Sequence, residues 1–143
     1  MSQADAELVA SFLGARVHEP VDDPRDERDH DWSARWLHDA IEYDLFVADE
    51  RPISTRLQGR RLVQAYLDTL RDSYQIIEPG PTVCVPRGDV VIARGSELAS
   101  LLFRAQTVRA EWVASCRVER ASIRRISMCV FRFTIVTSQR RSA

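Results

Sequence analysis

The stretch WLHDAIEYDLFVADERPISTRLQGRRLVQAYLDTL, residues 36–70, decides the fold of this chain. It reads as the end of a helix at residues 36–39, a strand over residues 40–47 and a polar loop, after which Gln58-Gly59 opens another helix. That helix, predicted over Gly59–Arg71, carries one apolar stripe at helical spacing. The stripe consists of Leu62, Val63, Tyr66, Leu67 and Leu70.

Two further helices are predicted upstream of this stretch. Apolar residues at i, i+4 spacing predict a helix over Asp5–His18, and Pro20 discourages its continuation. Residues 22–31 are almost wholly charged, so they bury nothing and are expected to form an exposed loop. A short helix over Trp32–His38 is expected to turn its tryptophans and Leu37 inward.

Beyond Ser73 the apolar period changes to two, which is the period of a strand. Val108–Val118 is the clearest strand, because apolar residues alternate with largely charged ones, as in a sheet packed on one face only. A tight connection at Arg120-Ala121 leads to a last strand over Ile123–Val136, and residues 138–143 are predicted to be disordered. Shorter strands are predicted over Tyr74–Ile77, Thr82–Val85, Asp89–Arg94 and Leu98–Phe103, with Pro79-Gly80-Pro81 separating the first two.

Helices early and strands late predict an α+β fold, with three helices on one face of a curved antiparallel sheet. The 143 residues are expected to form a single domain, because a chain of this length buries about 70% of its unfolded surface. The other face of the sheet would stay open, and Val113 with the outward residues of 130–135 would expose apolar area there. We therefore expect a homodimer that pairs through the sheet.

Composition excludes several classes of function. A formal net charge of −1 gives no basic surface for nucleic acid, and no apolar run approaches the ~18 residues of a membrane span. The N-terminus lacks the pattern of a signal peptide, and Cys84, Cys116 and Cys129 have no paired spacing, so a cytoplasmic protein with reduced thiols is expected. All 20 basic residues are arginine, which excludes Schiff-base lysine chemistry and a lysine-containing phosphate loop.

Two motifs resemble a known family. Residues 39–44, DAIEYD, resemble the end of the first strand of SnoaL-like proteins, and RAEWVASCRVE at 109–119 followed by SIRRI at 122–126 resembles their closing hairpin. From Leu8 to about Phe133 the chain thus resembles the SnoaL-like, ketosteroid-isomerase-like branch of the nuclear transport factor 2-like superfamily. The resemblance implies a cone-shaped fold with a pocket between helices and sheet.

The resemblance also implies a site. It makes Asp44 the catalytic carboxylate, and the period of two turns Glu42 and Phe46 to the same face. The tyrosine and second acid that stabilise the enolate in steroid isomerases correspond to Phe12 and to a position near Ala114. Neither Phe12 nor Ala114 has a side-chain proton to donate, which favours a cyclase or dehydratase. In such an enzyme His18 or a water would stabilise the charge. The substrate-binding residues are expected to be Phe12, Glu42, Phe46, Tyr66 and Trp112.

These residues predict an enzyme of secondary metabolism that acts on a small apolar metabolite by carboxylate proton transfer, as a polyketide-type cyclase, isomerase or dehydratase. No cofactor is expected. His30 and His38 adjoin Asp31 and Asp39, but no further ligands cluster with them, so no metal site is expected. Two alternatives stay open: a non-catalytic ligand-binding or dimeric accessory protein, and the small subunit of a ring-hydroxylating oxygenase.

Overall fold

A computed structural model describes residues 3–17 and 31–138 of the chain. Its elements, in chain order, are helix α1 (Gln3–Val17), a 3-10 turn η2 (Trp32–Arg35), β1 (Leu37–Val47), β2 (Ile53–Gln58), helix α2 (Arg60–Ser73), β3 (Tyr74–Arg87), β4 (Val90–Leu101), β5 (Gln106–Glu119) and β6 (Ser122–Ser138). His18, most of the predicted charged loop at 22–31 and the tail after Ser138 lie outside the described residues.

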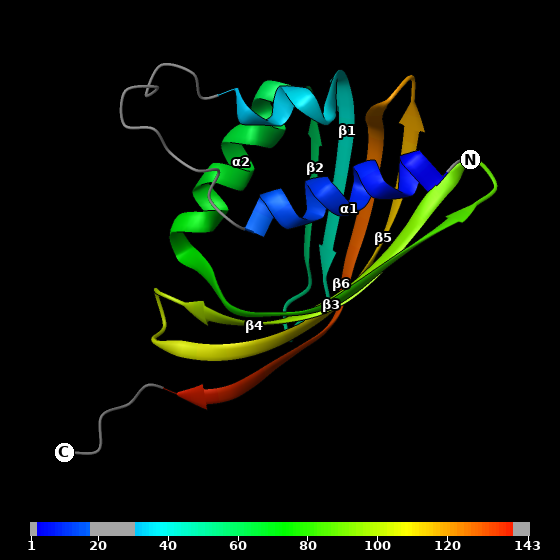
Figure 1. Cartoon of the computed structure of the whole chain (residues 1–143). Helices are drawn as coiled ribbons and strands as arrows, with labels where there is room; N and C mark the ends of the chain where they lie inside the picture. Colours follow the sequence, from blue (N-terminus) through cyan, green and yellow to red (C-terminus); the bar gives the residue numbers. More distant parts are fainter. Residues whose placement is uncertain (1–2, 18–30, 139–143) are drawn as a thin grey trace.

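The six strands form one curved sheet in the order β2-β1-β6-β5-β4-β3. Strand β1 runs parallel to β6, and all other neighbours are antiparallel. Both helices and η2 cover the concave face of the sheet (Figure 1), with α1 against β3 and β4 and α2 against β1, β2 and β3. No helix among the described residues is long and apolar enough to cross a membrane.

The core lies between the helices and the concave face because each element turns its apolar side there. On α1 the buried residues Ala6, Val9 and Leu13 follow helical spacing, and on β5 every second residue from Val108 to Cys116 is buried. Helix α2 contributes Val63 and Leu67. A sheet that is covered on one side only therefore explains the alternation in the sequence.

The structure confirms the α+β class, the helix predicted over Gly59–Arg71 and the two long C-terminal strands. Several expectations about elements were wrong. The sheet is mixed, and a 3-10 turn replaces the helix predicted over Trp32–His38, so the described residues contain two α-helices. Strand β1 begins at Leu37. The polar loop before Gln58 contains β2, an edge strand whose residues are exposed or only half-buried.

The four short strands predicted between Tyr74 and Phe103 are two long ones, β3 and β4. The pairing of β3 with β4 shifts its register around Pro79 and Thr82, so the Pro-Gly-Pro segment forms an irregularity within β3. Regular pairing with β4 resumes beyond this segment. Glycine is required there, because a Cβ on Gly80 would lie 2.6 Å from the backbone oxygen of Ser96. Pro79-Gly80-Pro81 therefore bends a continuous strand.

Candidate functional site

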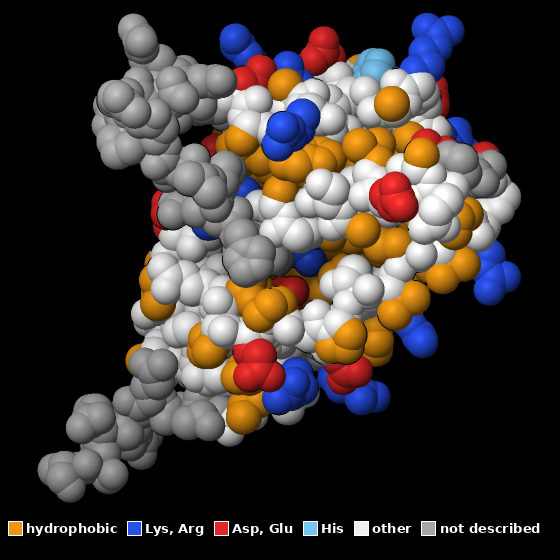
Figure 2. Space-filling view, viewed as in Figure 1, with side chains coloured by type: hydrophobic (Ala, Val, Ile, Leu, Met, Phe, Trp, Pro, Cys, Tyr) orange, Lys and Arg blue, Asp and Glu red, His pale blue; other side chains and the backbone are white. Residues whose placement is uncertain are grey.

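A cavity of about 200 Å³ lies between α1, α2 and the concave face of the sheet. We call it the cone cavity; the residues that line it are Arg16, Tyr43, Leu45, Val47, Ile53, Tyr66, Leu70, Tyr74, Glu97, Trp112, Met128, Val130 and Phe133. Figure 2 shows hydrophobic side chains around the hollow beneath the helices, with acidic and basic atoms recessed among them. A concave apolar site with a few converging polar groups is the usual form of a small-molecule pocket.

Glu97 is the one carboxylate among the residues that line the cone cavity, and it is only 7% exposed. Strand β4 turns it inward with Ala93 and Ala99. The Tyr74 hydroxyl donates to Glu97 Oε2 over 2.6 Å, and Trp112 Nε1 donates to Oε1 over 3.2 Å. Arg16 adds a positive charge, with Nη2 3.7 Å from Oε1. The buried Glu97 carboxylate is thus hydrogen-bonded through both oxygens and paired with a positive charge, which offsets the cost of its burial.

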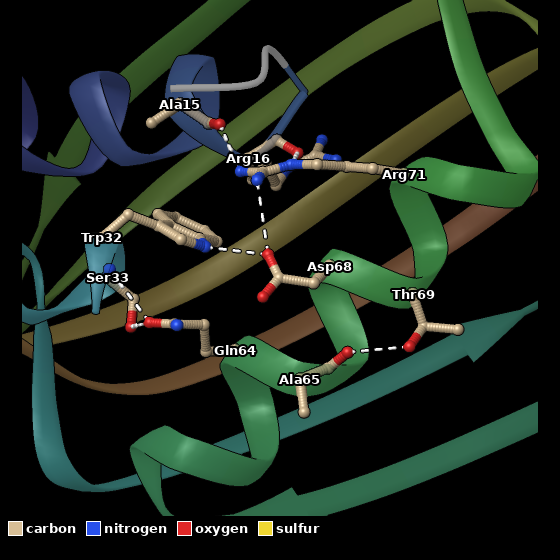
Figure 3. A network of polar contacts seen from close by, with 9 residues as sticks. All are labelled: Ala15, Arg16, Trp32, Ser33, Gln64, Ala65, Asp68, Thr69 and Arg71. Carbon is tan, nitrogen blue, oxygen red and sulfur yellow. Dashed lines mark hydrogen bonds and ion pairs between the residues drawn. The ribbon is translucent and has the colours of Figure 1, made fainter. Parts of the chain in front are cut away.

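Arg16 is held at this position by the end of α1. Arg71 of α2 donates from Nη2 to the Ala15 carbonyl over 2.8 Å and from Nε to the Arg16 carbonyl over 3.2 Å. These are carbonyls of the last helical turn, which need partners and favour a cation. The Arg71 guanidinium also stacks 4.2 Å from the Trp32 ring and contacts Asp68, which accepts from Trp32 (Figure 3). This network fixes the helix turn that carries Arg16.

Three tyrosines give the cavity hydroxyl groups that stay protonated. Burial raises the pKa of Tyr43 to about 12, and burial raises the pKa of Tyr66, whose hydroxyl also bonds with Thr55. Burial and the adjacent Glu97 carboxylate raise the pKa of Tyr74 far above its usual value. The rings of Tyr43 and Tyr66 lie 6.0 Å apart. At neutral pH these groups are therefore hydrogen-bond donors, not bases.

The raised pKa of Tyr43 predicts a loss of stability in alkali. Its pKa is near 10 in the unfolded chain and about 12 in the fold, so the stabilising difference is complete below pH 10 and is lost as pH rises to about 12. We expect about 2–3 kcal/mol to be lost from Tyr43 over this window. Urea unfolding at several pH values measures it.

A Tyr43→Phe variant has no proton to lose at this position, so its stability should fall less between pH 10 and 12. Cys116, whose pKa burial raises to about 12, contributes to the loss in both proteins and cancels from the comparison. An equal loss in the wild type and the variant would contradict the prediction.

Of the five predicted substrate-binding residues, the structure places two at the cone cavity and three away from it. Tyr66 and Trp112 line the cone cavity. Phe12 is fully buried and packs against Trp32 and Trp36, so it belongs to the core. Glu42 and Phe46 lie on the other face of the sheet, which we call the outer face. His18 lies outside the described residues.

The expected placement of Asp44 in the cavity was wrong. Tyr43 and Leu45 of β1 line the cone cavity, so the period of two turns Asp44 to the outer face. There its carboxylate pairs with Arg56 at 2.9 Å and Arg125 at 3.0 Å, and Glu42 also pairs with Arg125. Two arginines and solvent surround Asp44 where an apolar wall was expected, so we do not propose it as the catalytic carboxylate.

Among the described residues, His38 and the three cysteines do not line the cone cavity. His38 is exposed, and its Nδ1 accepts from the Ala40 backbone N–H over 2.9 Å. In the described part of the chain, no three His, Cys, Asp or Glu side chains lie close enough to hold a metal ion. Cys116 is buried with a raised pKa, so it is an unreactive thiol.

Solved structures share this fold, whereas no family model and no curated protein matches the sequence. An NTF2-like protein from Burkholderia xenovorans is 19% identical, with a TM-score of 0.68 over 90% of this chain and 89% of that one. A candidate isomerase from Bacillus subtilis is 13% identical, with a TM-score of 0.68 over 90% and 88%. A candidate polyketide cyclase from Xanthomonas campestris is 18% identical, with a TM-score of 0.60 over 89% and 90%. The chain therefore has the nuclear transport factor 2-like fold, the fold of SnoaL-like and ketosteroid-isomerase-like proteins.

Proposed function

We propose that the chain is an enzyme that binds a small, largely apolar molecule in the cone cavity and moves a proton on it with the Glu97 carboxylate. The observation that carries this proposal is a single buried carboxylate at the wall of an apolar cavity. Isomerisation, cyclisation and dehydration all begin with such a proton transfer, and the solved structures with this fold include a candidate isomerase and a candidate polyketide cyclase.

The contacts of Glu97 suit a general base. Tyr74 donates to one carboxylate oxygen and Trp112 to the other, so both oxygens are fixed in direction. An ionised carboxylate has about four acceptor positions, so lone pairs are left for a substrate proton. A positioned carboxylate of this kind contributes ~10²–10⁴-fold to a proton transfer. Arg16 balances the charge of Glu97 before the proton moves.

The proposal is tested with 2-indanone, a bicyclic ketone whose acidic C–H groups lie next to its carbonyl. In D₂O the protein is expected to speed the exchange of these protons for deuterium, which NMR follows directly. An Asp44→Asn variant should keep the wild-type rate, because Asp44 lies on the outer face with Arg56 and Arg125. Loss of exchange in that variant, with the fold intact, would move the base to Asp44 and overturn the assignment.

We also propose that two copies pair through the outer face. An open groove of about 580 Å³ crosses it, and Phe46 and Val113 beside it are 42% and 36% exposed. Cys129 also lines this groove. The segment 130–135 was expected to expose apolar area on the outer face, but its residues Val130 and Phe133 line the cone cavity. Exposed apolar area around a groove in a sheet favours association.

Pairing through the outer face predicts a dimer in sedimentation velocity at micromolar concentration. Val113→Arg places a charge in the apolar part of the groove and is expected to give a monomer. Leu62→Arg is the matched control, because Leu62 is also an exposed apolar residue, 52% exposed, but lies on α2. A monomeric wild type, or a dimeric Val113→Arg variant, would refute this interface.

A further inference from the structure

Among the residues that the structure describes, the guanidinium of Arg16 does not find the full set of hydrogen bonds that a buried cation needs. Its side chain is only 8% exposed, and its Nε has no hydrogen-bond partner among the residues that the structure describes. Its Nη2 is 3.7 Å from Glu97 Oε1, which is an ion-pair distance but too long for a hydrogen bond. The ring centroid of Trp112 lies 5.1 Å from the guanidinium carbon and offers no acceptor atom.

Such an arrangement is costly for a group that serves stability alone. A guanidinium carries five N–H donors in a planar fork, and a buried donor without an acceptor costs its full desolvation. Arg16 is nevertheless held firmly, because Arg71 fixes the backbone of its helix turn and Trp112 stacks on it. Arg16 lines the cone cavity beside Glu97, so an oxygen atom of a bound molecule can supply an acceptor to its guanidinium.

The charge of the site decides what kind of oxygen this is. Arg16 and Glu97 together are neutral, and Glu97 lies within 4 Å of the guanidinium. A carboxylate ligand at Arg16 would place a second negative charge beside Glu97 in a buried, apolar site, where like charges repel strongly. A carbonyl oxygen accepts the same hydrogen bonds and brings no net charge. The site therefore suits a neutral carbonyl compound.

We propose that Arg16 binds the carbonyl oxygen of a neutral, largely apolar ketone or aldehyde, and that this is the substrate class of the cone cavity. This inference rests on the proton transfer proposed for Glu97. Glu97 takes a proton from the carbon next to the carbonyl, the C–H pair becomes a C=C bond, and the carbonyl π pair moves to the oxygen. Arg16 stabilises the negative charge of this enolate oxygen. Return of the proton from Glu97 to the same carbon restores the carbonyl compound, and return to the γ carbon of an unsaturated carbonyl compound moves its C=C bond and so completes an isomerisation.

Three ligands with the same indane skeleton test the carbonyl site in the wild-type protein. They are 2-indanone, 2-methyleneindane, in which CH₂ replaces the oxygen, and indane-2-carboxylate. Because one hydrogen bond from a charged donor distinguishes the first two, calorimetry should show 2-indanone binding about 10-fold tighter than 2-methyleneindane. Equal binding of these two, no binding of either, or tightest binding of the carboxylate would overturn the inference.

Arg16→Met removes the guanidinium but keeps a long apolar side chain against Trp112. It is expected to bind 2-methyleneindane as the wild type does and to lose the preference for 2-indanone. Arg35→Met is the matched control, because the Arg35 guanidinium also lies 5.1 Å from a tryptophan ring centroid, that of Trp36, but is exposed. A preference retained in Arg16→Met would overturn the inference, and the wild-type comparison stands even if that variant does not fold.

Ligand binding tests the carbonyl site at Arg16, and deuterium exchange tests proton transfer by Glu97, so the two proposals can fail separately. A carbonyl preference that depends on Arg16, without any deuterium exchange, would support the carbonyl site and refute proton transfer by Glu97. Exchange that depends on Glu97, without a carbonyl preference, would support proton transfer and refute the role of Arg16.

Discussion

Replacing Glu97 with glutamine is expected to lower the deuterium exchange of 2-indanone by at least ~100-fold, the lower end of the contribution of a general base. The amide has nearly the shape of the carboxylate but cannot remove a proton. It also keeps the hydrogen bonds, because its oxygen accepts from Trp112 while its NH₂ group donates to the Tyr74 hydroxyl oxygen, which can reverse its direction. The loss should therefore appear in the rate, with the binding of 2-methyleneindane little changed.

Glu111→Gln is the matched control for this change. Glu111 is a strand glutamate that pairs with Arg132 at 3.1 Å, and it does not line the cone cavity. The same chemical substitution there should leave exchange within about twofold of the wild type, since surface changes away from a site have small effects. Exchange that survives Glu97→Gln, or falls equally in both variants, would show that Glu97 is not the base.

The misplacement of Asp44 shows how sequence pattern and family resemblance can disagree. In β1 the apolar residues Ile41, Tyr43, Leu45 and Val47 alternate with Ala40, Glu42, Asp44 and Phe46. The first set is the more apolar, and the structure turns Tyr43, Leu45 and Val47 to the cavity. The resemblance put the catalytic acid in the second set. Here the period of two carried the physical information, because a strand with one covered face buries its more apolar side.

Glu97 could have been found by the same pattern. Val91, Ala93, Gly95, Glu97 and Ala99 share one face of β4, so a glutamate stands alone on an otherwise apolar face. Dividing the segment into two short strands concealed this, since the period was not followed across Gly95. A lone acid on the buried side of a strand is a signal of a functional or paired carboxylate.

Arg16 and β2 could not be identified in this way. Arg16 follows the apolar stripe of α1 and reads as an ordinary basic residue in a last helical turn. Its burial depends on how α1 crosses β3 and β4, which local spacing does not encode. Strand β2 lies at the sheet edge with mostly polar residues, none of them buried, so the sequence there reads as a loop. Both features are products of tertiary packing.

Replacing Phe12 with alanine is expected to lower the free energy of unfolding by about 3–5 kcal/mol. The Phe12 ring is fully buried, lies 6.5 Å from the Trp32 ring and 6.3 Å from the Trp36 ring, and joins α1 to the η2 turn. Its removal leaves a cavity that these large rings cannot easily fill, and it loses the aromatic contacts as well. Urea denaturation measures the change.

Phe103→Ala removes the same atoms from a residue that is 86% exposed, so it should change stability by less than about 0.5 kcal/mol. The two variants also decide whether Phe12 is a core residue or a substrate-binding residue. Because Phe12 does not line the cone cavity, we expect it to be a core residue. At a temperature where the Phe12→Ala variant is still folded, it should bind 2-indanone nearly as tightly as the wild type. Weak binding together with unchanged stability would return Phe12 to the substrate site, because only a residue in contact with the ligand reduces affinity without loosening the core.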